Sequence, residues 1–387
     1  MEKIIAYLEE IKKQGLYREM RYLSAPQKPH TVIDGRKVLL MASNSYLGLC
    51  DDNRLKAAAI RAIEKYGVGS GGSRLTTGSY QLHKELEQKI ARFKGTEASI
   101  VFNTGYMTNV GAIAGIADKS WVVFSDELNH ASIIDGCRLS GAKIVVYKHC
   151  DMDDLYKKVK EFQGNPILIV TDGVFSMDGD IAPLDDIVKI AEEFSALTMV
   201  DDAHATGVLG PKGAGTGDYF GLKDKIDLQM GTLSKALASE GGFIAGKQYL
   251  IDYLRNKARS FIFTTALAPA TIAVAIKAIE IVEREPEARR VLLNNANWLQ
   301  NKLHDAGFKT LDSQTPIIPI VVGDSEKALQ FSNQLLEEGI YIPAIRPPTV
   351  PPGTSRLRLS LMATHSQDDL NYALTKIVQI GKRLNII

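Results

Sequence analysis

The sequence has few cysteines and almost no net charge. Its three cysteines, Cys50, Cys137 and Cys150, are an odd number and follow neither a zinc-binding nor a CxxC spacing. We therefore expect no metal site and a reduced, cytoplasmic protein rather than a secreted one. Lysine and arginine number 46 against 45 acidic residues, which gives a net charge of +1. Because there is no basic stripe, nucleic acid is not expected as a partner.

Long apolar runs, internal repeats and low-complexity segments are missing as well. No run approaches the roughly 18 apolar residues that cross a bilayer, so we expect no membrane partner. Residues 1–23 have apolar residues at helical spacing but neither the apolar stretch nor the cleavage site of a secretory signal. They predict a helix that packs on the protein surface.

The chain does contain a regular alternation of short apolar and longer amphipathic runs over residues 45–260. Continuous apolar strands separated by helices are typical of a mostly parallel sheet covered on both faces. The expected strands are 98–102, 121–124, 143–147, 167–171, 197–200, 227–230 and 243–245.

A second pattern follows, in which two long helices (269–285 and 286–304) come first. After them we expect a strand (317–322), a helix (326–338), short strands near 340–342 and 357–361, and a last helix from Gln367. The chain of 387 residues is too long for one ordinary core. We expect an α/β protein with an N-terminal helix and arm (1–44), a large domain (45–285) and a smaller C-terminal domain (286–387) that packs with the N-terminal segment. The proline-rich segment 346–358 is expected to be an ordered loop, and neither a helix nor an inner strand.

A glycine-rich segment, GVGSGG (67–72), matches the G-x-G-x-x-G pattern of dinucleotide sites. It follows a helical pattern rather than a strand, and no acidic residue lies about twenty positions further on. A nicotinamide site is therefore not expected, and no Walker A sequence occurs either.

Polar residues follow several of the expected strands, where open α/β sheets bind their ligands. These positions supply what pyridoxal phosphate (PLP) needs: a lysine for a Schiff base, an acid for the ring nitrogen and donors for the phosphate. Lys235 stands among small residues, and Asp201 directly follows a strand. Taken singly, each has a simpler interpretation, such as a solvated lysine or a turn aspartate. Their occurrence together favours a PLP site.

Six segments resemble the α-oxoamine synthases, which are PLP enzymes of fold type I that join an amino acid to an acyl thioester with loss of carbon dioxide. They are SNSYLGL (43–49), GSGGSR (69–74), DELNHASIIDG (126–136), TDGVFSMDGDIAPL (171–184), VDDAHATGVLG (200–210) and GTLSKALAS (231–239). The likeness extends over nearly the whole chain and implies a homodimer with active sites at the interface.

The resemblance implies a role for each matching residue. Lys235 would form the Schiff base, Asp201 would pair with the ring nitrogen, and His130 would stack on the ring and meet the substrate. His204 would bind the phenolic oxygen of the cofactor. The other expected cofactor-binding residues are Gly105, Tyr106, Ser176 and Thr232, with Thr264 and Thr265 donated across the dimer interface.

The resemblance also implies the substrate-binding residues. Arg358 would pair with the amino-acid carboxylate, and Thr349 and Arg18 would meet the acyl substrate, with Arg21 as the alternative to Arg18. Asn44 and Ser73 complete the expected set.

The segment AIRPPTVPPGTSRLRLSLMATH (344–365) is most similar to the branch of the family that condenses L-alanine with a pimeloyl thioester in biotin synthesis. The thioester carrier, coenzyme A or acyl-carrier protein, stays open. A sister enzyme that uses glycine and an acetyl thioester, or an aminotransferase, is the alternative. The presence of Lys235 argues against a non-catalytic subunit.

Overall fold

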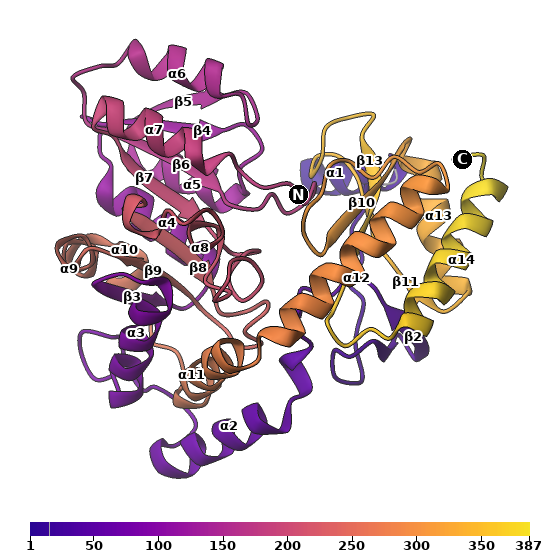
Figure 1. Cartoon of the computed structure of the whole chain (residues 1–387), viewed down its shortest axis with the longest axis horizontal. Coiled ribbons are helices and arrows are strands. Elements are labelled where there is room, and N and C mark those ends of the chain that lie inside the picture. The colour runs from indigo at the N-terminus through magenta and orange to yellow at the C-terminus, as the bar shows by residue number, and fades with distance from the viewer. Residues whose placement is uncertain (15) are drawn as a thin grey trace. The chain divides into compact units, whose positions relative to one another are not determined.

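The computed structural model describes residues 1–14 and 16–387 (Figure 1). The chain divides into two compact units. The large unit consists of Leu47–Ser176 and Asp180–Arg290, and the small unit consists of Met1–Tyr46, Met177–Gly179 and Val291–Ile387.

The large unit is built on a seven-stranded sheet with the order β3-β9-β8-β7-β6-β4-β5. Its strands are β3 (Ala98–Phe102), β4 (Val122–Asp126), β5 (Lys143–Tyr147), β6 (Ile167–Asp172), β7 (Leu197–Asp201), β8 (Leu228–Thr232) and β9 (Gly242–Gly246). The strands from β8 to β5 run parallel, and β9 pairs antiparallel with both β3 and β8. The expected α/β fold with a mostly parallel sheet is confirmed.

Helices cover both faces of this sheet. On one face α4 (Gly105–Ile116), α5 (Ala131–Ser140), α9 (Gln248–Lys257) and α10 (Arg259–Ile262) pack through residues such as Ile113 and Leu254. On the other face α6 (Met152–Lys160) and α7 (Leu184–Phe194) bury Leu155 and Ile187 against the sheet. Because both faces are covered, the central strands read as continuous apolar runs.

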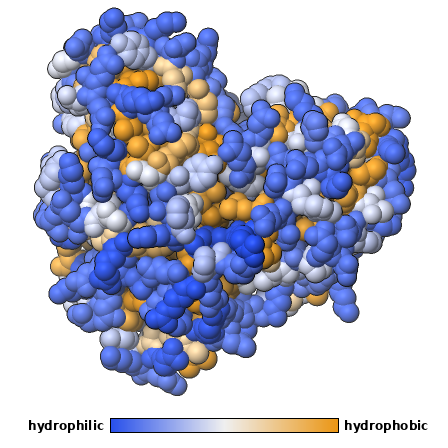
Figure 2. All heavy atoms as spheres, viewed as in Figure 1, coloured by the Kyte–Doolittle hydropathy of each residue, from blue (hydrophilic) through white to orange (hydrophobic). Residues whose placement is uncertain are grey.

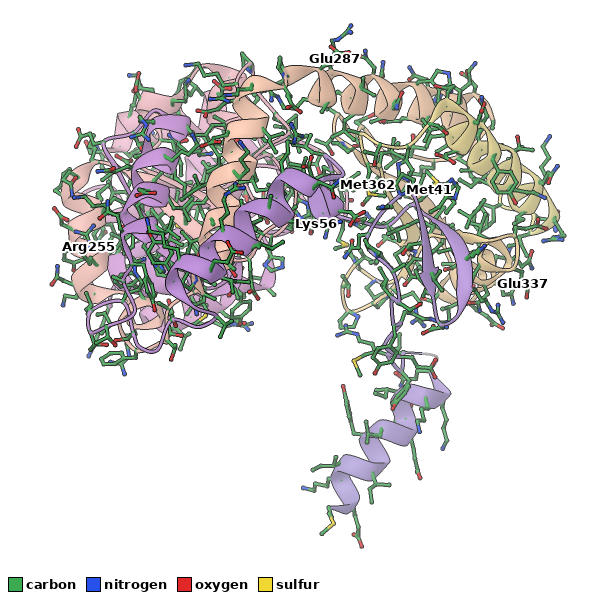
Figure 3. The ribbon with its side chains drawn as sticks, turned by 90° about the horizontal axis from the view of Figure 1, so that it is seen from below. Met41, Lys56, Arg255, Glu287, Glu337 and Met362 are labelled. Atoms are coloured by element: carbon green, nitrogen blue, oxygen red, sulfur yellow. The ribbon has the colours of Figure 1, made fainter. Side chains whose placement is uncertain are left out.

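The other helices of the large unit are α2 (Asn53–Tyr66), α3 (Gln81–Lys94), α8 (Thr216–Phe220) and α11 (Pro269–Arg284), with short 3-10 turns at Leu49–Asp51 and Lys223–Lys225. The helices α2 and α11 lie side by side (Figure 3). Arg54 of α2 forms an ion pair with Glu285, directly after α11.

The small unit contains two three-stranded sheets. One has the order β10-β13-β12 and the other β1-β2-β11. Their strands are β1 (His30–Ile33), β2 (Arg36–Leu40), β10 (Ile317–Gly323), β11 (Ile340–Tyr341), β12 (Ala344–Ile345) and β13 (Ser355–Ser360). The helices of the unit are α1 (Glu2–Lys13), α12 (Pro286–Asp305), α13 (Ser325–Glu337) and α14 (Gln367–Arg383). The first residues of α12 belong to the large unit. Met362, labelled in Figure 3, packs with Ile33, Val38 and Leu40.

Two expectations differ from the structure in this unit. The segment 346–358 is expected to be a loop, with no inner strand, and the next strand to lie near 357–361, but β13 already starts at Ser355 and is the middle strand of its sheet. The prolines end at position 352, so β13 keeps all of its backbone donors. The N-terminal helix α1 exposes Ile4, Ile5 and Leu8 instead of packing them within this chain.

Hydrophilic residues cover most of the face seen in Figure 2, with smaller apolar areas between them. Of the helices in the described part of the chain, none is long and apolar enough to cross a membrane.

Candidate active site

A cavity of about 280 Å³ lies at the carboxyl ends of β4, β6, β7 and β8 in the large unit. It is lined by Thr104, Gly105, Tyr106, Asn109, His130, Ser132, Asp172, Ser176, Asp201, Ala203, His204, Met230, Thr232, Ser234 and Lys235. The structure therefore brings together all the residues expected to bind the cofactor except Thr264 and Thr265. A larger groove of about 340 Å³ between α2, α3 and α11 contains none of the expected residues.

Lys235 lies on the loop that joins β8 to β9. Backbone hydrogen bonds close this loop: Leu233 donates to Gly241 at 2.9 Å, and Ser239 donates to Leu233 at 2.9 Å. The Nζ atom of Lys235 lies 2.8 Å from Nε2 of His204. The lysine amine is thus directed into the cavity and held beside a residue that follows β7.

Glycine is required where β9 begins, because β9 starts against the first turn of α4. A Cβ atom at Gly242 would lie 2.4 Å from Oγ1 of Thr108 and 2.9 Å from Cα of Gly105. The absence of a side chain lets the two elements approach and places the amino end of α4 at the cavity.

The carboxylate of Asp201 is held at the end of β7 by two donors. Its Oδ1 accepts the backbone N–H of Ala203 at 2.8 Å, and its Oδ2 accepts Nδ2 of Asn109 at 2.6 Å. Asp172 is its register partner on β6. Burial, and then the charge of Asp201, raises the pKa of Asp172 well above its ordinary value.

His130 is the N-cap of α5, and its ring borders the cavity. Its backbone N–H donates to Oδ2 of Asp172 at 2.7 Å, and its Nδ1 lies 2.7 Å from Oγ of Ser132. Although one side of His130 is open to the cavity, the surrounding protein buries enough of the ring to lower its pKa. The charge of Asp201 opposes this effect and that of Lys235 reinforces it.

The first turn of α4 provides an anion site. The N-cap Thr104 accepts the N–H of Met107 at 3.0 Å, while the N–H groups of Gly105 and Tyr106 have no acceptor within a helix. Such a helix start binds phosphate groups. Hydroxyl groups of Ser176, Thr232 and Ser234 line the same cavity.

The donor set fits PLP on chemical grounds. The cavity holds an amine that can form a Schiff base, a carboxylate held by two hydrogen bonds, an imidazole whose face is open, and N–H and hydroxyl donors for a phosphate. Lys235, Asp201, His130 and the start of α4 supply these groups in turn.

The sequence did not single out Asn109, Ser132 or Ser234 as members of the site. Asn109 is the only strongly polar residue in the middle of the apolar helix GYMTNVGAIAGI, and it is almost fully buried. That isolated polar residue is the signal that could have identified it. Ser132 lies inside the segment DELNHASIIDG (126–136), which matches the family, but no role was expected for it.

Three expected residues of the large unit do not line the cavity. Ser73 and Thr265 face each other in an isolated antiparallel bridge, and Thr265 accepts Nδ2 of Asn103 through its backbone oxygen at 2.6 Å. Thr265 is exposed and Thr264 is half-buried. Their expected contacts with substrate and phosphate stay predictions.

In the small unit the structure brings Arg358 and Asn44 together. Both Nη atoms of Arg358 lie 3.4 Å from Oδ1 of Asn44, and Nη1 donates to Oγ of Ser360 at 2.8 Å. Arg358 is buried in β13. This geometry orients a guanidinium group, and its expected role toward the amino-acid carboxylate stays a prediction.

Arg18 and Arg21 differ in their surroundings. Arg21 forms a 3.0 Å ion pair with Asp34. Arg18 is exposed. The pKa of Arg346 is lowered first by the burial of Arg346 and then by the charge of nearby Arg18. The backbone N–H of Thr349 donates to Arg346 at 3.0 Å, so the start of the proline-rich loop lies near Arg18.

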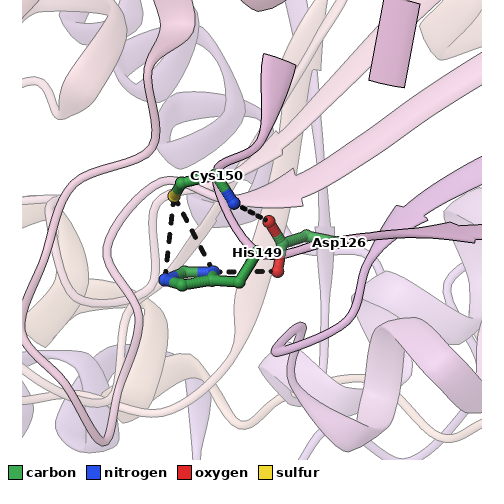
Figure 4. Close-up of side chains that lie close together, drawn as sticks. All are labelled: Asp126, His149 and Cys150. Carbon is green, nitrogen blue, oxygen red and sulfur yellow. Dashed lines mark hydrogen bonds and ion pairs between the residues drawn. The ribbon is translucent and has the colours of Figure 1, made fainter. Parts of the chain in front are cut away.

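Asp126, His149 and Cys150 form a cluster in the large unit (Figure 4), and their potential ligand atoms lie within 4.8 Å of one another. Both ring nitrogens of His149 contact carboxylates: Nδ1 lies 3.0 Å from Asp126 and Nε2 lies 2.8 Å from Asp180. Burial alone would lower the pKa of His149, but these hydrogen bonds, with that to Cys150, raise it to about 12.

Because both ring nitrogens of His149 are engaged by carboxylates from different segments, the cluster acts as a clamp between these segments. Asp126 lies four residues before His130 and holds the segment between them, because its Oδ1 accepts the N–H of Leu128 at 2.9 Å. Asp180 lies beyond Ser176, and its backbone oxygen accepts the N–H of Phe175 at 3.1 Å. His149 thereby ties together two segments that contribute to the cavity.

Comparison with known proteins adds the family. The profile of aminotransferase classes I and II matches residues 36–377. The 8-amino-7-oxononanoate synthase of Lysinibacillus sphaericus is 54% identical over 381 residues, which are 98% of each chain. That of Thermoanaerobacter pseudethanolicus is 50% identical over 382 residues, or 98% of this chain and 97% of the relative.

Solved structures of serine palmitoyltransferase are also similar. The enzyme of Sphingomonas wittichii superposes with a TM-score of 0.95 at 34% identity, covering 100% of this chain and 98% of that one. Another structure of a serine palmitoyltransferase with the same scores holds PLP. The chain therefore belongs to the family of aminotransferase classes I and II and, within it, to the 8-amino-7-oxononanoate synthases.

Proposed function

We propose that this chain is a PLP-dependent C-acyltransferase of biotin biosynthesis. It condenses L-alanine with a pimeloyl thioester and yields 8-amino-7-oxononanoate, carbon dioxide and the free thiol carrier. The observation that carries the proposal is the cavity around Lys235, in a chain 54% identical to a named 8-amino-7-oxononanoate synthase over 98% of both lengths.

The cavity residues divide the work between them. PLP supplies an aldehyde for the covalent link to an amine and a ring that takes up an electron pair from the alanine Cα. Lys235 would hold PLP through Nζ, and the same atom, as a free amine, would accept the Cα proton. Asp201 would keep a proton at the ring nitrogen, and the start of α4 would bind the phosphate. His204, 2.8 Å from Nζ, orients the amine.

Substrate recognition falls to residues outside the cavity lining. Arg358, oriented by Asn44, pairs with the carboxylate of alanine through its planar fork. Arg18 meets the acyl substrate, because Arg21 is engaged with Asp34. The protein acts as a homodimer in which Thr264 and Thr265 reach the phosphate of the partner subunit.

The test is product formation by purified protein supplied with PLP. With L-alanine and pimeloyl-CoA we expect 8-amino-7-oxononanoate, detected by mass spectrometry, with coenzyme A released in equal amount. Parallel reactions contain glycine with acetyl-CoA, L-serine with palmitoyl-CoA, and alanine with pimeloyl-acyl-carrier protein. A glycine–acetyl or serine–palmitoyl product in the absence of the pimeloyl product would contradict the proposal. The carrier-protein reaction identifies the thioester donor.

A further inference from the structure

A chain of hydrogen bonds connects His130 to Asp201 through two residues of the cavity. Nδ1 of His130 lies 2.7 Å from Oγ of Ser132, and Nδ2 of Asn109 lies 2.8 Å from the same oxygen. The same Nδ2 lies 2.6 Å from Oδ2 of Asp201. Asn109 and Ser132 are both about 1% exposed, so water has little access to these contacts.

The directions of these hydrogen bonds follow from the chemistry of the groups. The amide nitrogen of Asn109 has two hydrogens and accepts none, so it donates one to Asp201 and the other to Ser132. The carboxylate of Asp201 fixes the orientation of the amide, because the amide oxygen would be repelled there. Oγ of Ser132 is therefore an acceptor toward Asn109.

The hydroxyl hydrogen of Ser132 then points to Nδ1 of His130, the other polar atom in reach. The backbone N–H of Ser132 is directed to the same atom at 3.3 Å. Nδ1 thus receives two donors and keeps its lone pair. In a neutral imidazole the proton must then reside on Nε2.

We propose that Asn109 and Ser132 are positioning residues that fix His130 as a neutral imidazole with its proton on Nε2. The ring then offers the cavity an N–H donor, suited to an oxygen of the substrate, and it cannot take up a proton there. The use of this donor rests on the proposed function. The position of the proton is a property of the chain and can be measured without turnover.

The charged groups around the ring are compatible with a neutral His130. Asp201 favours the protonated ring, whereas burial and Lys235 disfavour it. Asp172 accepts the backbone N–H of His130. Tyr106 and His204 line the same cavity.

The experiment is a long-range ¹H–¹⁵N correlation on PLP-loaded protein labelled with ¹⁵N-histidine. The chain has 7 histidines, and His130→Gln assigns the signals of His130. We expect the Nε2–H tautomer from pH 6 to pH 8. A proton on Nδ1, or a ring that is charged over this range, would overturn the proposal.

Ser132→Ala tests the donor. The hydroxyl stabilises the neutral ring, so its removal should raise the pKa of His130 by about one pH unit. The tautomer preference should weaken without vanishing, because the backbone N–H of residue 132 still points to Nδ1. The matched control is Ser99→Ala, which removes another buried hydroxyl of the large unit, bonded to the backbone of Glu87 at 2.7 Å. Equal His130 titrations in the two variants would contradict the proposal.

Asn109→Leu tests the second step of the chain. The leucine fills a similar space but donates no hydrogen, so Ser132 is free to reorient and the tautomer preference of His130 should weaken. The wild-type tautomer in this variant would remove Asn109 from the proposal. If the tautomer is as expected but no pimeloyl product forms, the proposed function fails and this inference stands.

Discussion

At the scale of single residues, the site depends on neighbours that are far apart in sequence. Lys235 is a cation in a loop of small residues, and its amine meets His204 from the end of another strand. The sequence predicts both residues as members of one site, because each lies three positions after the end of a strand. The helix pattern marks Asn109 as an isolated polar residue, but it does not reveal the contacts of Asn109 with Asp201 and Ser132.

Lys235→Ala should lower kcat by at least about 10³-fold, because the variant loses both the covalent link and the proton acceptor. Steady-state kinetics with alanine and pimeloyl-CoA measure the loss, and borohydride reduction followed by peptide mapping shows whether PLP still attaches at this position. Lys247→Ala, at an exposed lysine of the same unit, is the control. Activity close to wild type in Lys235→Ala would refute its assigned role.

His149→Gln should destabilise the protein in a pH-dependent manner. The folded-state pKa of about 12 lies above the ordinary value of 6.5, so the stabilisation is complete below pH 6.5 and decreases as the pH rises toward 12. Urea unfolding of wild type and variant should therefore show a larger difference in free energy at pH 6 than at pH 9. His304→Gln, on an exposed residue, should show no such trend. A constant difference at both pH values would mean that the clamp carries no charge.

At the scale of secondary-structure elements, the strands of the large sheet and β10, β11 and β13 of the small unit could be predicted, whereas β1, β2 and β12 could not. Most strands of the large sheet are short, mainly apolar runs, because helices bury them on both sides, whereas the edge strand β5 is partly exposed. In the small unit β12 has only two residues, and β1 and β2 begin with charged or polar residues, so none of the three shows a clear period. The central position of β13 depends on its pairing with β10, which lies more than thirty residues earlier in the chain.

Gly242→Ala tests the contact between β9 and α4. The added methyl group would overlap Thr108 and Gly105, and such overpacking costs about 1–3 kcal/mol. Because the displaced element is the phosphate-binding start of α4, we also expect a higher Kd for PLP, measured by fluorescence titration. Gly69→Ala, where a Cβ atom has no neighbour within 4 Å, is the control. Unchanged stability and PLP affinity in Gly242→Ala would show that the contact is not needed.

At the scale of the whole molecule, two exposed features of the single chain are compatible with a second copy. The helix α1 exposes Ile4, Ile5 and Leu8, and Thr265 is exposed outside the cavity. Both fit the proposed homodimer, in which a second copy would cover apolar surface and receive the threonines. Neither the composition nor the pattern of the sequence predicts this assembly, which comes from the resemblance to the family.

Mixed dimers test the exchange of threonines between subunits. Lys235→Ala subunits are combined with subunits that carry Thr264→Val and Thr265→Val, each inactive or nearly so alone. If the threonines act on the partner, random mixing should restore about a quarter of the wild-type activity, because half of the dimers contain one intact site. No recovery after verified subunit exchange would place the threonines in their own subunit's site.

Asp172 and Asp201 lie side by side at the ends of β6 and β7, and both are almost fully buried. Two neighbouring acids in such a place oppose folding, and a positively charged ring nitrogen beside Asp201 would relieve that opposition. A ligand that binds only the folded chain adds about 2.7 kcal/mol of stability at 100 times its Kd. The supply of vitamin B6 would therefore determine the resistance of the protein to heat and proteolysis, in addition to its catalytic activity.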